Sequence, residues 1–401
     1  MLFEQKILQR EIGRTDPDFV LFSPKQTGYE DDNVHLHVVR HELLGGLIAV
    51  WTQSSYDGSG DNHAMIAFSR DDGVTWTEPR YVAGARPGHR INDKQASWAF
   101  PVISRSGRIY LFYFRETDYV DNHRGISAAF ACMTSDDFGE TWSESTDIPM
   151  RMTPFDSSEV QNNNIYQLPR RLPDGRYLFA YTKWSSYRIR ARGSKWYEDD
   201  SHIYFMRCEN LDDDPEPKDL RFTFLPDDEH GVGIPTGVGD SSVAQEPCPV
   251  SLPDGRLFCT VRTSLGHAAY TVSSDGGHTW TAPNPIRFSD GGVFVHPLSP
   301  CPIYETAPGA YALLFHGNAD DIGGSRNPLY RAVGRFAAAE EQPIRFEREE
   351  CTLFMALPEG ASIPGHTCNQ LAMYSSAVKI GGRTVLCYPD RKCFLLGKYL
   401  D

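Results

Sequence analysis

Ser69-Arg70-Asp71-Asp72-Gly73-Val74-Thr75-Trp76 is the stretch that decides the fold, because its pattern, S-x-D-x-G-x-T-W, occurs three times. The pattern returns at residues 135–142 and 273–280. The second copy begins 66 residues after the first, and the third begins 138 residues after the second, which is two steps of 69. A fixed long period is typical of repeat folds, and about 67 residues per unit divides the chain into roughly six units.

Each unit also contains the signals of four β-strands. In the fourth unit, strand-like stretches at 249–252 and 256–261 flank a Pro-Asp-Gly turn, and a third stretch leads into the repeat motif. Asp-Gly turns favour hairpins because glycine accepts positive φ. Second strands of the same kind are expected at 46–51, 108–114, 176–181, 310–315 and 383–388. The sequence therefore predicts an all-β fold, a six-bladed β-propeller with four antiparallel strands per blade, as one domain over residues 1–401.

The sixth unit ends at Asp401 without a clear fourth strand. The apolar segment Phe19-Val20-Leu21-Phe22 is expected to supply that strand and close the ring, which removes open sheet edges. In the repeat motif, the aspartate is expected to accept hydrogen bonds from its own turn, and the tryptophan to pack as an apolar plug. We interpret these residues as structural: Asp71, Asp137 and Asp275; Trp76, Trp142 and Trp280.

Composition restricts the partners and the compartment. A formal charge of −14 argues against nucleic acid or an anionic membrane as the main partner, although a few arginines in a cleft can still attract a small anion. The nine cysteines include no CxxC pair, so we expect free thiols rather than a zinc site, and no cofactor. No apolar run or signal-like N-terminus is present, which predicts a soluble cytoplasmic protein. A mature secreted or periplasmic form would look the same, and the oligomeric state stays open.

In a propeller, the first residues of all inner strands meet in one bowl at the end of the axis. Counting back seven or eight positions from each first hairpin turn finds these residues. The count gives His37, Trp98, Tyr166, Glu246 and Tyr374, and in blade 5 only Ser299 or Pro300. Aromatic, histidine and glutamate side chains together are typical of a sugar site, because rings stack on the pyranose and polar tips bind its hydroxyls. The alternative is that Trp98 and Tyr166 are ordinary core residues.

Together these features resemble the sialidase (neuraminidase) superfamily with Asp-box, or BNR, repeats, over essentially the whole chain. Four further matches to residues of that family occur in the same order along the chain. They are Asp61 before the third strand of blade 1, Glu246 with Arg262 in blade 4, Arg326 in the stretch 325–329, and Tyr374 in the stretch 373–376. The resemblance implies a retaining exo-glycosidase that hydrolyses a terminal acidic sugar, sialic acid or a related sugar, from a glycan.

The resemblance also implies a role for each matched residue. Tyr374 is the nucleophile with Glu246 as its base, and Asp61 is the acid and base at the leaving oxygen. A neutral phenol suits this substrate, because a carboxylate nucleophile would be repelled by the sugar's own carboxylate. Arg262 and Arg326 hold that carboxylate through planar, charge-assisted hydrogen bonds. Each residue has a plainer alternative, as an ion-pair anchor, a core tyrosine or an ordinary acidic loop residue.

Blade 1 departs from the family, which carries an Arg-Ile-Pro stretch there. The corresponding segment, Asn33-Val34-His35-Leu36-His37-Val38-Val39, contains no arginine. His35 and His37 fall on one strand face by the two-residue period and are candidates for substrate binding, but histidine lacks the bidentate fork. A metal pair lacks an evident third ligand. Two alternatives follow: a uronic-acid-directed hydrolase or lyase using His35 or His37 as acid or base, and a non-catalytic glycan-binding propeller.

Three other segments are candidates for the rim of the bowl. The basic, aromatic insertion 188–197 is expected to contact a polyanionic glycan or a neighbouring subunit, or to be an exposed loop. The polar stretch 89–95 leads into the inner strand of blade 2. The Gly-, Asp- and Pro-rich run 226–239 is long enough to form a lid.

Overall fold

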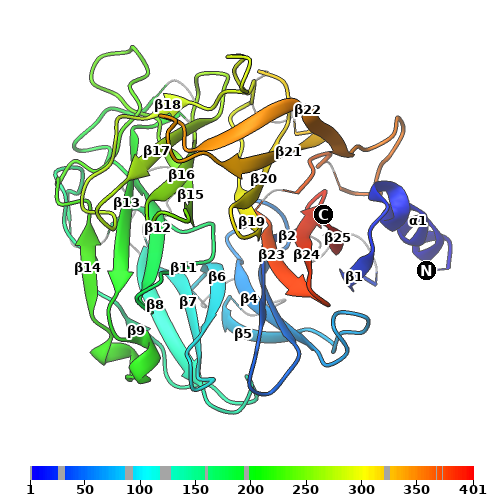
Figure 1. Cartoon of the computed structure of the whole chain (residues 1–401). Coiled ribbons are helices and arrows are strands. Elements are labelled where there is room, and N and C mark those ends of the chain that lie inside the picture. Colours follow the sequence, from blue (N-terminus) through cyan, green and yellow to red (C-terminus); the bar gives the residue numbers. More distant parts are fainter. Residues whose placement is uncertain are drawn as a thin grey trace.

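The computed structural model describes residues 2–25, 32–85, 94–117, 128–158, 161–193, 198–319, 326–366, 368–372 and 374–401. Over these residues the strands form six sheets that follow one another around an axis, the six-bladed β-propeller that the sequence predicts (Figure 1). Each sheet is antiparallel throughout, with the first strand of the blade innermost. The almost all-β architecture is interrupted by one α-helix in the described ranges.

The first three blades are consecutive in the chain. Blade 1 contains β2 (Asp32–Arg40), β3 (Leu47–Ser54), β4 (His63–Ser69) and β5 (Arg80–Gly84). Blade 2 contains β6 (Ala96–Ile103), β7 (Ile109–Glu116), β8 (Ala128–Ser135) and β9 (Thr146–Asp147). Blade 3 contains β10 (Asn163–Asn164) and β11 (Arg170–Arg171), which both pair with β12 (Tyr177–Trp184), followed by β13 (Ser201–Cys208) and β14 (Phe222–Leu225).

The remaining blades complete the ring. Blade 4 contains β15 (Gln245–Ser251), β16 (Leu257–Arg262), β17 (Ala269–Ser273) and β18 (Asn284–Pro285). Blade 5 contains β19 (Ile303–Ala307), β20 (Ala310–Phe315), β21 (Leu329–Phe336) and β22 (Ile344–Met355). Blade 6 contains β23 (Ser376–Ile380), β24 (Arg383–Asp390), β25 (Phe394–Tyr399) and β1 (Phe19–Phe22).

Blade 6 is closed by the N-terminal strand, as the sequence predicts. β1 pairs with β25, with Phe19 opposite Gly397 and Val20 opposite Leu396 (Figure 1). Gly397 allows the close approach, because a Cβ at this position would lie 3.2 Å from the Cβ of Phe19. The two ends of the chain are therefore joined in one sheet, so blade 6 is complete only when both are in place.

The sequence analysis did not predict the helix α1 (Leu2–Ile12), which precedes the ring-closing strand. Its Leu8 is buried against blades 5 and 6. Its Glu11 is fully buried and accepts a 2.8 Å hydrogen bond from Nη1 of Arg391, which also bonds to Asp390. Breaking a buried charge group of this kind by removing one member is costly, because the partner is left charged and unpaired. The helix is thus fixed to the turn between β24 and β25.

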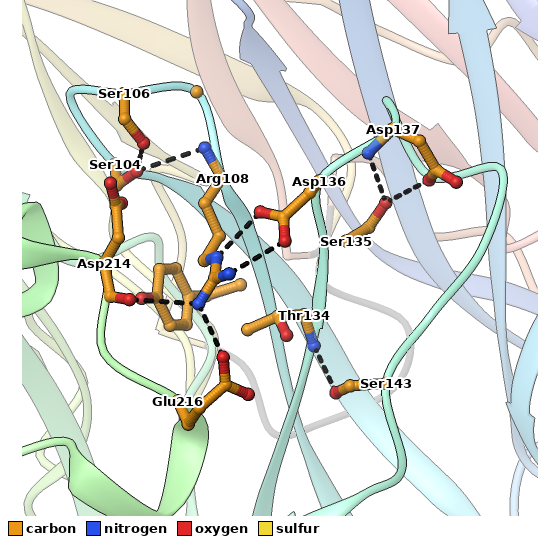
Figure 2. Close-up of polar contacts among 12 residues, drawn as sticks. Ser104, Ser106, Arg108, Thr134, Ser135, Asp136, Asp137, Ser143, Asp214 and Glu216 are labelled. Atoms are coloured by element: carbon orange, nitrogen blue, oxygen red, sulfur yellow. Dashed lines mark hydrogen bonds and ion pairs between the residues drawn. The ribbon is translucent and has the colours of Figure 1, made fainter.

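The repeat motif has the structural role that the sequence predicts. In blade 2 the Oγ of Ser135 donates to Oδ1 of Asp137 at 2.8 Å (Figure 2). Thr141 also donates to Asp137, from its backbone N (2.8 Å) and from Oγ1 (2.5 Å). Asp71 and Asp275 make the same contacts in blades 1 and 4. The tryptophans pack partly buried beside their blades, and Trp280 stacks on Phe205 at 4.2 Å.

The nine cysteines all lie in the described residues and form no disulfide, and seven of them are buried, which agrees with the expected free thiols. Among the described residues there is also no helix with the length and apolar character needed to cross a membrane.

Adjacent aspartates in blade 2 allow a direct test of the motif. Asp136 makes an exposed ion pair with Arg108, whereas Asp137 organises the turn (Figure 2). We expect Asp137→Ala to lower the midpoint of thermal unfolding clearly more than Asp136→Ala, because exposed ion pairs contribute little. Hydrogen bonds from Thr141 lower the pKa of Asp137 to about 2. Its stabilisation is therefore present above about pH 4 and lost as the pH falls toward 2. Equal effects of the two variants would refute this role.

Candidate functional site

Four residues at the starts of the inner strands have a left-handed backbone: His35 (φ 55), Trp98 (φ 56), Glu246 (φ 51) and Tyr374 (φ 60). In blades 1, 2 and 4 the pairing register with the second strand shifts at the same point, as in a β-bulge. A residue other than glycine pays roughly 1–2 kcal/mol for this conformation, and such residues cluster at functional sites. The repeated bulge therefore marks the bowl.

Because of this bulge, one prediction for blade 1 is wrong. The residue count gives His37, but the left-handed residue equivalent to Trp98 and Glu246 is His35. Between Val34 and His37 the strand contains one residue more than its partner, so the strict two-residue alternation expected for His35 and His37 is wrong here. The count is otherwise right for blades 2, 4 and 6.

Threonines on the second strands hold two of these bulges. The backbone N of Trp98 donates to Oγ1 of Thr52 at 2.9 Å, and the backbone N of Glu246 donates to Oγ1 of Thr182 at 2.8 Å. Thr52 lies in blade 1 and Thr182 in blade 3, so in both cases the preceding blade holds the bulge of the next. The sequence analysis missed both threonines, because a threonine in a strand is unremarkable by itself.

The four aromatic side chains of the bowl (His35, Trp98, Tyr166 and Tyr374) form one cluster. The rings of His35, Tyr166 and Tyr374 pack in a triangle, with centroids 4.4 Å (His35–Tyr374), 4.8 Å (Tyr166–Tyr374) and 5.4 Å (His35–Tyr166) apart. Trp98 contacts His35 and Tyr166 edge-on, at 6.1 and 5.9 Å. Residues of blades 1, 2, 3 and 6 that are far apart in the sequence are thus brought together, as predicted.

Tyr374 is hydrogen-bonded to Glu246. Its hydroxyl donates to Oε1 of Glu246 at 3.2 Å, and Nη1 of Arg262 donates to the same oxygen. Burial raises the pKa of Tyr374, and the Glu246 carboxylate adds to that effect. The phenol is therefore protonated at neutral pH and needs a base to become a nucleophile, and the adjacent carboxylate is in place to be that base.

Arg262 has two nitrogens without a partner. Nε and Nη2 are buried and make no hydrogen bond among the described residues, and the side chain is 3% exposed. The second carboxylate oxygen of Glu246 is also buried and makes no hydrogen bond among the described residues. Buried polar groups without partners are rare and costly, and a guanidinium left in this state is suited to bind an anion. Arg326, also buried, donates to Oε1 of Gln370 and to the carbonyl of Leu298, both at 3.2 Å.

The blade 1 histidines are buried and uncharged. Neither ring nitrogen of His35 or His37 has a hydrogen-bond partner among the described residues. Burial lowers the pKa of His37 to about 3, and burial, followed by His37 and Lys392, lowers the pKa of His35. Both rings are therefore neutral at physiological pH, and neither supplies the positive charge of the missing arginine. The structure shows no metal-binding group of three or more side chains within its described residues.

Asp61 lies at the bowl end of blade 1, in the loop between β3 and β4, where the resemblance expects it. Its carboxylate accepts hydrogen bonds from the backbone N and Oγ of Ser55 and from Oγ of Ser59, and the residue is 3% exposed. These serines must release one oxygen before Asp61 can protonate a leaving group.

The sequence analysis missed Lys392, which lies in the turn between β24 and β25. Its charge, with those of Arg262 and Arg326, acts against the rise in the pKa of Tyr374. A Pro-Asp-Arg-Lys-Cys stretch in a hairpin gives no sequence signal for the bowl, because its position depends on how blade 6 meets blade 1.

The three rim segments are only partly described. In the insertion 188–197, Arg188 is exposed and Arg190 lies within 4 Å of carboxylates of Asp200 and Asp240, while residues 194–197 lie outside the described residues. Most of the stretch 89–95 is outside them as well. In the run 226–239, Val232 pairs with Ile203 of β13, so part of the expected lid is tied to blade 3. Its role as a lid stays a prediction.

Comparison with known proteins identifies the family. The model of the BNR repeat-like domain matches residues 45–292. A search of curated proteins found no match. Among solved structures, a protein of unknown function from Dyadobacter fermentans DSM 18053 is 13% identical (96% of this chain, 97% of that chain, TM-score 0.63).

Two sialidase structures have the same fold. The intramolecular trans-sialidase from Ruminococcus gnavus is 13% identical over 94% of this chain and 96% of its own, with a TM-score of 0.62. The NanB sialidase from Streptococcus pneumoniae is 13% identical over 95% of this chain and 69% of its own, with a TM-score of 0.59. Identity this low shows a common fold and no more. Since the family model covers more than half of the chain, the protein belongs to the family of the BNR repeat-like domain.

Proposed function

We propose that this protein is a retaining exo-glycosidase that hydrolyses a terminal acidic sugar, sialic acid or a close relative, from a glycan. The observation that carries the proposal is the arrangement of Tyr374, Glu246 and Arg262, in which a phenol, its base and a partly unpaired guanidinium meet in one buried cluster. The fold shared with sialidases supports the same class of substrate.

In this mechanism Tyr374 attacks the anomeric carbon while its proton passes to Glu246 across the existing hydrogen bond. A covalent glycosyl–tyrosine forms and the leaving oxygen receives a proton from Asp61. Water, activated by Asp61, then cleaves the bond to Tyr374, which recovers its proton. The sugar carboxylate is bound by the unpaired Nε and Nη2 of Arg262 and by Arg326.

Asp61 can act in this way only if the 55–61 loop rearranges, because Ser55 and Ser59 hold its carboxylate. This contact favours a second candidate function, a glycan-binding propeller without turnover. The uronic-acid alternative, with His35 or His37 as a general acid, has no comparable support, because both rings are buried and neutral.

The first test uses aryl sialosides and aryl glucuronides with wild type, Tyr374→Phe and Tyr113→Phe. Tyr113 is the matched control, because its hydroxyl bonds to Ser145 in blade 2 and loses the same atom on substitution. We expect the wild type to cleave the sialoside, Tyr374→Phe to lose this turnover and Tyr113→Phe to keep it. Binding of the acidic sugar without turnover would establish the glycan-binding alternative. Turnover that is indifferent to Tyr374 would refute the proposed nucleophile.

The second test concerns the acid clamp. Arg262→Gln removes the guanidinium, and hydrogen bonds to charged groups contribute about 1.5–3 kcal/mol, so KM for an acidic sugar should rise about 10- to 100-fold. Binding of N-acetylneuraminic acid by calorimetry measures the same loss without turnover. Thermal unfolding of the variant shows that the fold is retained. An unchanged affinity would contradict a clamp at Arg262.

The third test concerns the charge of His37. The pKa of His37 is about 3 in the folded protein, and its ordinary value is 6.5. Between these two pH values the unfolded chain therefore binds more protons than the folded protein. Stability should therefore fall as the pH decreases from about 6.5 toward 3. His37→Gln should show a shallower fall than wild type in urea unfolding. A histidine that titrates near its ordinary value, as the uronic-acid mechanism requires, would leave the slopes equal.

A further inference from the structure

The turn between β24 and β25 contains two consecutive left-handed residues that are not glycine, Arg391 (φ 53) and Lys392 (φ 56). Residues in this region persist only where their surroundings hold them. Here the fully buried Arg391 bonds to Glu11 of α1 and to Asp390, and its backbone N donates to the carbonyl of Gln370 at 3.0 Å. These contacts of Arg391 fix the conformation of the turn, and they therefore also fix the backbone of the next residue, Lys392.

Lys392 lies beside the part of blade 1 that lacks an arginine. Its carbonyl accepts a hydrogen bond from the backbone N of Asn33, and the side chain of Asn33 donates to the carbonyl of Cys393 at 3.0 Å. Its Nζ is 4.0 Å from a carboxylate oxygen of Asp32. The lysine side chain, 13% exposed, therefore stands at the start of the blade 1 inner strand.

The inner strand of blade 1 connects the place of Lys392 to the bowl. Two residues after Asn33, the ring of His35 lies 4.4 Å from that of Tyr374, and the backbone N of Leu36 donates to the carbonyl of Tyr374 at 3.1 Å. The positive charge of Lys392 acts against the rise in the pKa of Tyr374, in the same direction as the charges of Arg262 and Arg326.

The present partner of Lys392 is a carboxylate from the rim. Oδ2 of Asp57 lies 3.0 Å from Nζ of Lys392, and the Asp57 side chain is 54% exposed whereas the lysine is largely buried. Asp57 comes from the 55–61 loop, which also carries Asp61. An exposed carboxylate paired with a largely buried cation is the arrangement that a substrate carboxylate would replace.

We propose that Lys392 is the third cation of the substrate-carboxylate site, in place of a blade 1 arginine, and that Asp57 is an internal competitor which the substrate displaces. The inference rests on the proposed function and names the residue that completes its acid clamp. Displacement of Asp57 also frees the 55–61 loop, the movement that Asp61 needs before it can act.

The test measures binding of N-acetylneuraminic acid, and in parallel glucuronic acid, by calorimetry. Lys392→Met should raise the Kd about 10-fold or more, because one charge-assisted hydrogen bond is lost, and Lys392→Arg should restore most of the affinity. Asp57→Asn should lower the Kd several-fold, because it removes the nearer of the two carboxylates at Lys392 and leaves only Asp32, 4.0 Å away. The double variant should bind as weakly as Lys392→Met.

The matched control is the ion pair of Lys398 and Asp16 (3.4 Å), which lies outside the bowl. Lys398→Met and Asp16→Asn change the charge equally and should leave the Kd unchanged. If Asp57→Asn and Lys392→Met weaken binding alike, the pair is a structural brace and the inference is wrong. An unchanged Kd in Lys392→Met also refutes it, while the loss in Arg262→Gln still supports the proposed function. If wild type binds neither acid, the proposed function fails as well.

Discussion

The site depends on one backbone constraint, the left-handed residue at the start of an inner strand. An extended strand turns successive side chains to opposite faces, so it cannot by itself gather side chains from several blades on the axis. The bulge breaks this alternation in blades 1, 2 and 4, and Tyr374 has the same conformation just before β23. The threonine contacts to Trp98 and Glu246 show that neighbouring blades hold these strained residues. The bowl is therefore a property of the closed ring rather than of any single blade.

Ring closure has a second consequence, because it brings the two ends of the chain to the site. β1 completes blade 6, and α1 is fixed through Glu11 to Arg391, whose neighbour Lys392 reaches blade 1. The backbone of Gln370 bonds to Arg391, and its side chain bonds to Arg326. The N-terminal helix, the turn and the second arginine of the bowl are thus one connected polar group.

The propeller could be predicted from the sequence because the Ser-x-Asp-x-Gly-x-Thr-Trp spacing is regular and the first hairpin turn of each blade contains a Gly. Glu246 and Tyr374 could also be predicted, because the distance from the turn to the bulge is nearly constant. The residue count gives His37 instead of His35, because an extra residue in a bulge leaves no mark in a single sequence. Lys392 and α1 could not be found, because their place at the site follows from contacts between blade 6 and blade 1. The bonds that hold Asp61 also arise only in the folded loop.

The proposed mechanism requires a covalent bond between Tyr374 and the sugar. This bond is tested by mass spectrometry of the protein quenched in acid while it acts on an aryl sialoside. We expect a peptide containing Tyr374 that carries the mass of one sialyl group, and its absence from Tyr374→Phe. Sialoside hydrolysis with Tyr374 unmodified, an adduct on another residue, or no hydrolysis at all would contradict this mechanism.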